Sequence, residues 1–248
     1  RAARTVRAVA AVSVEHAGRR AQATPGAEVP TVPITVAPRM AYNPSYQSVF
    51  VFGPSNLMLA LTLIPAMLTA LGVVREKEMG TMVNLYASPG AISEFLIGKQ
   101  LPYVALTLLS YLTLVAVLIW GLGVPLKGSF LALTLGATAY AFAITAMGLL
   151  ISAFVQTQVA AQFLTAILCV IITTNFAGVL SPVSTLDGVN FYIAQGFPSS
   201  WFQKVSLGVF TKNWQVQWHT LGVACVVMMG FSVAYLTAAR LFVSKQER

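Results

Sequence analysis

The side chains that most often carry out chemistry in proteins are few in this sequence, and they do not cluster. The histidines are His16 and His219, and the cysteines are Cys169 and Cys225. None of them has a second potential ligand at the spacing that zinc sites use. Both cysteines fall in long apolar stretches, where a thiol usually packs as a small hydrophobic group. The sequence therefore predicts no catalytic residue, no metal site, no cofactor and no disulfide.

Nucleotide binding is a second kind of chemistry that the sequence can be tested for. Its one Gly-Lys pair is Gly98-Lys99. A phosphate-binding loop around this pair requires glycine at position 93 and serine or threonine at position 100. The chain has Ser93 and Gln100 instead. We therefore predict that the chain is not an enzyme and does not bind ATP through such a loop.

Four consecutive charged residues, Arg75, Glu76, Lys77 and Glu78, follow a long apolar stretch. They stand out because only 9% of the 248 residues are charged and 57% are hydrophobic, a composition typical of membrane proteins. A charge at the centre of a membrane-spanning helix costs about 2.5 to 3.5 kcal/mol. We therefore expect this run to lie at the end of a span, where its charges can meet water or a partner.

The elements that must position this run are apolar stretches long enough to cross about 30 Å of hydrocarbon. Five stretches qualify: 54–74, 101–124, 130–154, 159–180 and 216–242. The sequence thus predicts an all-α polytopic membrane protein, with a transmembrane domain over residues 50–248. Residues 1–49 have helical spacing followed by alternating Val32, Ile34 and Val36. They are expected to be the remnant of an α/β extracytoplasmic domain.

Basic residues predict the orientation of these spans. If residues 75–99 and the C-terminus face the cytoplasm, six lysines and arginines of the short loops lie there and three lie outside. Six arginines in residues 1–39 would then be outside, which long translocated segments tolerate. Lipid headgroups and topology account for the net charge of +8, so we predict membrane lipids and no nucleic acid as partners.

Residues 75–99 are expected to form an elbow along the membrane surface. Four apolar residues recur there at helical spacing after the charged run: Met79, Met82, Val83 and Tyr86. The charges should begin this helix, and Ser88 should cap a second short helix that ends before Lys99. Two interpretations remain open: a solvated loop whose apolar face rests on lipid, or a docking element for a cytoplasmic partner.

Polar side chains inside the spans are candidates for a translocation path. A helix turning 100° per residue places five of them on an arc of about 80°: Gln158, Gln162, Thr165, Cys169 and Thr173. Such residues either pack helices together or face a substrate, and Gln158, Gln162 and Thr165 are the candidates for the second role. No Asp or Glu lies within the five spans, which argues against ion coupling. An ion-coupled transporter or an integral-membrane enzyme remains the alternative to a pump driven by a partner.

The stretch VVREKEMGTMVNLYASPGAISEFLIGKQLPY, residues 73–103, resembles the signature of ABC type-2 exporter permeases. Two shorter segments add to the resemblance: RMAYNPSYQSVFVFGP at 39–54 and FPSSWFQKVSLGVFTKN at 197–213. The pattern is similar to the multidrug-type subgroup, which has a large extracytoplasmic domain after its first span. Members have six spans, so the resemblance implies that this chain lacks the first one and part of the outer domain.

The resemblance also implies a function, partners and a location. A membrane-spanning permease subunit would export a drug-like, lipid or other amphiphilic substrate across a bacterial plasma (inner) membrane, with its C-terminus cytoplasmic. The residues matching the ATPase-coupling segment are Arg75, Glu76, Lys77, Glu78, Gly80 and Thr81. They would contact cytoplasmic ABC ATPase subunits or fused ATPase domains. A second permease copy would complete a homo- or heterodimer, and residues 181–212 would form re-entrant helices at the outer mouth.

Overall fold

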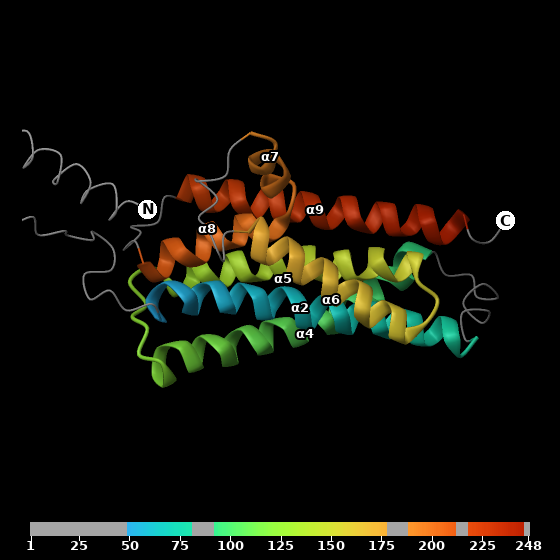
Figure 1. Cartoon of the computed structure of the whole chain (residues 1–248), viewed down its shortest axis with the longest axis horizontal. Coiled ribbons are helices and arrows are strands. Elements are labelled where there is room, and N and C mark those ends of the chain that lie inside the picture. Colours follow the sequence, from blue (N-terminus) through green and yellow to red (C-terminus); the bar gives the residue numbers. More distant parts are fainter. Residues whose placement is uncertain (1–48, 81–91, 178–187, 212–217, 246–248) are drawn as a thin grey trace, which may run out of the picture. The chain divides into compact units, whose positions relative to one another are not determined.

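The computed structural model describes residues 49–80, 92–177, 188–211 and 218–245, all within one compact unit, Met40–Arg248. Helices follow one another along the chain (Figure 1): α2 (Val49–Glu78), α4 (Ile92–Ala116), a π-helical segment η1 (Val117–Gly121), α5 (Phe130–Phe154), α6 (Gln158–Asn175), α7 (Val189–Gln195), α8 (Pro198–Thr211) and α9 (Trp218–Lys245). No strand occurs in these residues. Apart from Val49, the predicted α/β remnant lies outside them.

Five helices in the described residues are long and apolar enough to cross a membrane, which confirms the predicted all-α class with five spans. They cover Phe52–Glu78, Ile92–Gly121, Phe130–Phe154, Gln158–Asn175 and His219–Phe242. Hydrophobic length is a local property of the sequence, so the five spans could be found without knowledge of their packing.

The charged run occupies a different place in its helix from the one predicted. Arg75 to Glu78 end α2 and do not begin a new helix, so that prediction was wrong. Gly80, with φ of +69°, follows in the left-handed conformation that commonly ends helices. The short helix predicted before Lys99 is also continuous with the following span, because α4 runs unbroken from Ile92. The predicted helix beyond Gly80 lies outside the described residues.

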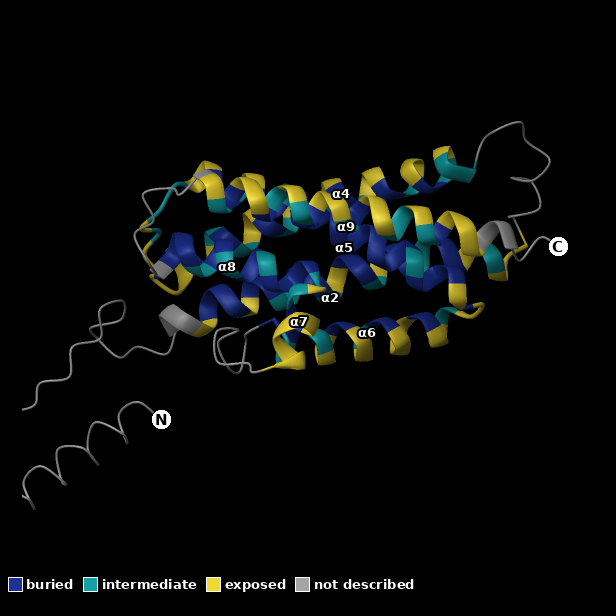
Figure 2. Ribbon diagram, turned by 90° about the horizontal axis from the view of Figure 1, so that it is seen from above, coloured by how far each residue is buried: buried dark blue, intermediate teal, exposed yellow. Residues whose placement is uncertain are grey.

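The central helix of the bundle is α5, which packs against α2, α4, α8 and α9. In its apolar window 78% of residues are buried, against 22% for α6 at the periphery (Figure 2). Small residues allow this close approach. At Gly148 an added Cβ would lie 2.5 Å from the carbonyl oxygen of Ala66 in α2, and at Gly136 one would lie 2.9 Å from Val205 of α8.

The predicted outer loop, 181–212, contains α7 and α8. Four apolar side chains of α8 are buried, Phe202, Val205, Val209 and Phe210, and α8 packs on α2 and α5. The backbone N–H of Gly128, just before α5, donates to the carbonyl of Val209 at 2.8 Å. We conclude that α8 is part of the helical core and not a simple connection.

Candidate functional site

The first candidate contact lies between the end of α2 and the start of α4. Glu76 accepts a hydrogen bond from the ammonium of Lys99 and forms an ion pair with it. Their side chains are 26% and 32% exposed, so water only partly screens the attraction. The ammonium also lies 5.8 Å from the ring centroid of Phe95. Glu76 therefore joins the cytoplasm-predicted ends of two spans.

Lys77 joins the same end of α2 to the last turn of α5. Its half-buried ammonium donates to the carbonyl of Ser152 at 2.6 Å, with the carbonyls of Ala153 and Val155 at 3.4 and 3.5 Å. The last four carbonyls of a helix have no partner within it, and the helix dipole places partial negative charge there. A lysine ammonium satisfies both needs, so Lys77 caps α5 from a neighbouring helix.

Glu78 makes the corresponding contact with the start of α6. Its carboxylate accepts from the backbone N–H of Gln158 at 2.7 Å and from the side-chain amide of the same residue. A negative charge is favoured at a helix N-terminus because the first N–H groups are unpaired there. Thr157 caps the helix as well, accepting from the N–H of Ala160 at 3.3 Å.

Three successive residues of α2 thus bind the ends of three other helices. We call Glu76, Lys77, Glu78, Lys99 and Gln158 the charged cluster. The remaining charge of the run, Arg75, is exposed and forms no ion pair within the described residues. Gly80 is exposed too, and Thr81 lies outside the described residues. Arg75 therefore offers a free cation at the surface beside the charged cluster.

The three residues that are candidates for a translocation path differ in exposure and in their contacts. Gln158 is bound to Glu78. Gln162 is exposed on α6, whereas Thr165 is buried and its hydroxyl has no hydrogen-bond partner among the residues that the structure describes. A path along these residues stays a prediction.

A second polar group lies inside the bundle, and sequence reasoning missed it. The hydroxyl of Tyr140 in α5 is hydrogen-bonded to that of Thr62 in α2 and, at 3.1 Å, to that of Ser199 in α8. Its ring stacks on Phe202, with centroids 4.5 Å apart and planes 5° apart. We call Thr62, Tyr140 and Ser199 the hydroxyl cluster. The hydroxyl cluster joins the central helix α5 to α2 and to α8 through uncharged groups only.

Two amides make further polar contacts inside the bundle. Gln203 of α8 donates to the hydroxyl of Ser55 at 2.7 Å. Gln100 of α4 donates to the carbonyl of Phe142 at 2.8 Å and to the hydroxyl of Thr145 at 3.1 Å. A buried amide is costly without partners, so a glutamine in an apolar helix is itself a sequence signal for an interhelical bond. That signal identifies the residue but not its partner.

Chemically, the charged cluster is suited to transmitting force. No group of three or more potential metal ligands occurs in the part of the chain that the structure describes. The residues of the charged cluster make an ion pair and charge-assisted hydrogen bonds near helix ends. Such contacts hold helices together and involve no chemically reactive group. A displacement of the end of α2 would therefore be passed directly to α4, α5 and α6.

Comparison with known proteins gives this geometry a context. A family model described as "ABC-2 family transporter protein" matches residues 6–241. The chain is 36% identical over 125 residues to the "Probable multidrug ABC transporter permease YbhS" of Escherichia coli (strain K12), covering 50% of this chain and 33% of that protein. For YbhR of the same strain, with the same description, the identity is 28% over 145 residues, or 58% of this chain and 39% of that protein.

A more distant relative matches over a longer stretch. The "ABC transporter G family member 20" of Dictyostelium discoideum is 23% identical over 215 residues, which is 86% of this chain and 29% of that protein. The chain thus spans roughly a third of the length of the curated relatives it matches.

Proposed function

The chain belongs to the ABC-2 family of transporter proteins, and from this premise we propose that it is the membrane-spanning permease of an ATP-driven exporter. ATPase domains, on separate chains or fused to this one, would act from the cytoplasmic side, and a second permease copy would complete the transporter. The end of α2 and the C-terminus would face the cytoplasm of a bacterial cell, in its inner membrane.

The observation that carries this proposal is the charged cluster. Glu76, Lys77 and Glu78 bind α4, α5 and α6 within a single turn of α2. An ATPase pressing on this turn would move four helix ends together. Ion pairs at a partly hydrated edge suit such movement, because water can replace a partner while the helices shift.

Arg75 is proposed to be the contact with the ATPase itself. Its side chain is exposed next to the charged cluster, and the neighbouring charges already have partners in this chain. Complementary charge across an interface favours specific association. The run would thus have two roles: one residue binds the partner, and three residues pass the movement on.

We propose an amphiphilic substrate, drug-like or lipid. Two relatives, YbhS and YbhR, are described as probable multidrug ABC transporter permeases. The spans offer apolar surface with scattered polar groups, which suits a molecule of mixed polarity. Gln162, exposed on α6, is the member of the predicted path that remains accessible to such a molecule.

The test uses the full-length protein, purified with its ATPase and reconstituted in liposomes. ATP hydrolysis and ATP-dependent movement of ethidium, a cationic amphiphile, are measured together. Glu76→Lys places two cations side by side, so we expect hydrolysis to continue while transport falls. The double variant Glu76→Lys with Lys99→Glu restores the ion pair and should recover transport. Arg75→Glu should instead reduce the amount of ATPase that copurifies.

Lys127→Glu is the matched control, because Lys127 is an exposed cation in the segment between α4 and α5. Lys127→Glu should change neither ATP-dependent ethidium transport nor the amount of ATPase that copurifies. The proposal is contradicted if the full-length protein neither contains an ATPase domain nor copurifies with an ATPase. Coupled transport that is unchanged in Glu76→Lys would contradict the role of the charged cluster alone.

A further inference from the structure

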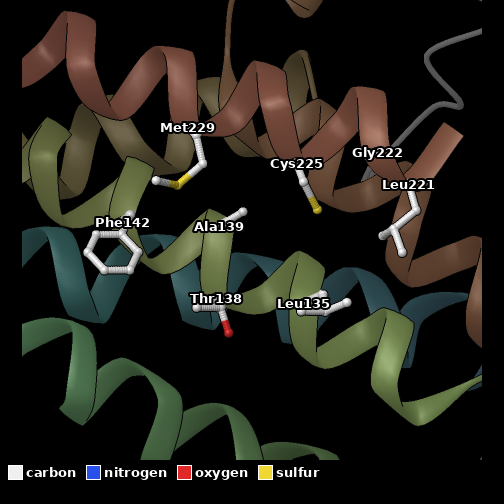
Figure 3. Close-up of a pocket in the computed structure, with 8 residues that line it drawn as sticks. All are labelled: Leu135, Thr138, Ala139, Phe142, Leu221, Gly222, Cys225 and Met229. Carbon is white, nitrogen blue, oxygen red and sulfur yellow. The ribbon is translucent and has the colours of Figure 1, made fainter. Parts of the chain in front are cut away.

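Two apolar grooves lie along one face of α9. The first, the α5–α9 groove, has a volume of about 430 Å³ and is lined by Leu221, Gly222, Cys225 and Met229 of α9 with Leu135, Thr138, Ala139 and Phe142 of α5 (Figure 3). The second, the α4–α9 groove, has a volume of about 210 Å³ and is lined by Val233, Leu236, Thr237 and Arg240 of α9 with Ser93, Leu96 and Ile97 of α4. Spacings of three and four residues continue from one to the other, as expected for a single helix face.

A polar contact between three helices separates the two grooves. The carbonyl oxygen of Phe142 in α5 accepts from the amide of Gln100 in α4 at 2.8 Å and from the hydroxyl of Ser232 in α9 at 3.2 Å. Ser232 lies between Met229, in the first groove, and Val233, in the second. The grooves are therefore separate sites, one toward each end of α9.

The grooves differ in charge. The α5–α9 groove has no charged residue in its lining. The α4–α9 groove has Arg240, an exposed arginine that forms no ion pair and donates no hydrogen bond within the described residues. Ser93 adds a hydroxyl donor, while the neighbouring carboxylate, Glu94, is not part of the lining. An unpartnered guanidinium and a hydroxyl thus lie beside an apolar groove.

The position of the α4–α9 groove suits a lipid headgroup. Val73 of α2, Leu96 of α4, Leu149 of α5 and Ala239 of α9 form one buried cluster, so Arg240 lies at the same end of the bundle as the charged cluster. This end is where spans meet the membrane surface. A long arginine side chain can lie along apolar surface there with its guanidinium at headgroup level.

We propose that the α4–α9 groove binds an anionic phospholipid. One acyl chain covers Ile97, Val233 and Leu236, and the phosphate accepts hydrogen bonds from the Arg240 guanidinium and the Ser93 hydroxyl. Guanidinium binds phosphate in a bidentate manner, and cationic sites between membrane helices favour anionic lipids. The net negative charge of the headgroup complements the single cation of the groove. The inference is independent of the transported substrate.

Native mass spectrometry of the full-length protein tests this proposal, with phosphatidylglycerol and phosphatidylcholine added in turn to delipidated samples. We expect the wild-type protein to retain phosphatidylglycerol preferentially. Arg240→Gln should weaken that binding about fivefold, the factor that corresponds to about 1 kcal/mol per cation near a membrane surface. Arg240→Lys keeps the charge and should retain most of the preference.

Two controls separate this groove from general effects. Arg75→Gln removes a cation from the same end of the bundle but outside the groove, and it should not alter lipid binding. Gly222→Leu fills the uncharged α5–α9 groove, where an added Cβ meets no atom within 4 Å, and it should leave phosphatidylglycerol bound.

Three results would overturn the proposal. Equal retention of both lipids by the wild-type protein would mean that the groove binds acyl chains without regard to headgroup. If Arg240→Gln retained as much phosphatidylglycerol as the wild-type protein, the lipid would bind elsewhere. Loss of copurifying ATPase in Arg240→Gln, with phosphatidylglycerol retained, would mean that Arg240 contacts a protein partner instead.

Discussion

The charged cluster at the end of α2 and the hydroxyl cluster around Tyr140 both join α2 to α5, but by opposite means. The charged cluster uses full charges at helix ends, partly exposed. The hydroxyl cluster uses neutral groups, each buried, and adds a stacked aromatic pair. Both clusters bind α2 to α5, but only the first can exchange its partners for water.

Depth in the membrane explains this difference. A buried polar group that loses its partner keeps the full cost of desolvation, so contacts in the hydroxyl cluster resist separation. Ion pairs near the surface are worth little to stability because solvent competes for them. We infer that the bundle is fixed around Tyr140 and adjustable at the end of α2. This arrangement would let an ATPase move helix ends without unfolding the core.

The largest loss of stability is expected when Tyr140, the centre of the hydroxyl cluster, is replaced. Tyr140→Ala deletes a fully buried ring that stacks on Phe202 and two hydrogen bonds. Large-to-small changes of buried aromatics cost about 3 to 5 kcal/mol. Equilibrium unfolding in mixed micelles should report this loss, whereas Trp120→Ala, at a side chain 85% exposed, should change little. Equal effects of the two variants would mean that Tyr140 does not anchor the core.

Gly148→Ala tests the close approach of α2 and α5 between the two clusters. The added methyl would lie 2.5 Å from the backbone carbonyl of Ala66, which cannot rotate away. Overpacking of this kind costs about 1 to 3 kcal/mol. Gly98→Ala is the matched control, because an added Cβ there meets no atom within 4 Å. A stability unchanged by Gly148→Ala would show that α2 and α5 can separate freely.

Lys77→Met probes the adjustable end. The variant keeps the apolar stem but removes the ammonium that caps α5, so we expect a loss of about 1 to 2 kcal/mol, typical of a partly buried charge at a helix terminus. High salt should reduce the difference in unfolding free energy between Lys77→Met and the wild type, measured in the same assay. A loss as large as that of Tyr140→Ala would refute the division into fixed and adjustable regions.

The smallest changes in stability are expected from substitutions in α6. Thr165→Val removes a buried hydroxyl that has no partner, so unfolding free energy should stay within about 0.5 kcal/mol of the wild type or rise. Gln162→Leu changes an exposed side chain and should also leave stability unchanged. If Gln162 faces the substrate, this second variant alone should alter which amphiphiles are exported. A stability loss in Gln162→Leu would indicate a packing contact instead.

Sequence reasoning found the charged run and the five spans but misjudged how they meet. The break expected before Lys99 does not exist, because α4 continues as one helix from Ile92 to Ala116, even with Pro102 inside it, and the π-helical segment follows. Gln158 was a candidate for facing a substrate and is bound to Glu78. The helical pattern was read correctly at Gln158, while the partner of its side chain lies 80 residues away in the chain.

The sequence by itself determined the membrane class, the number of spans and the place of the charges at the edge of a span. These depend on local hydrophobic length and on the cost of a charge in hydrocarbon, which need no tertiary contact. Tertiary structure alone decided that Glu76 pairs with Lys99, that Lys77 caps α5 and that Tyr140 joins α2 to α8. All five spans are apolar, so hydrophobicity alone does not choose their neighbours, and small residues such as Gly148, where two backbones approach, help to select them.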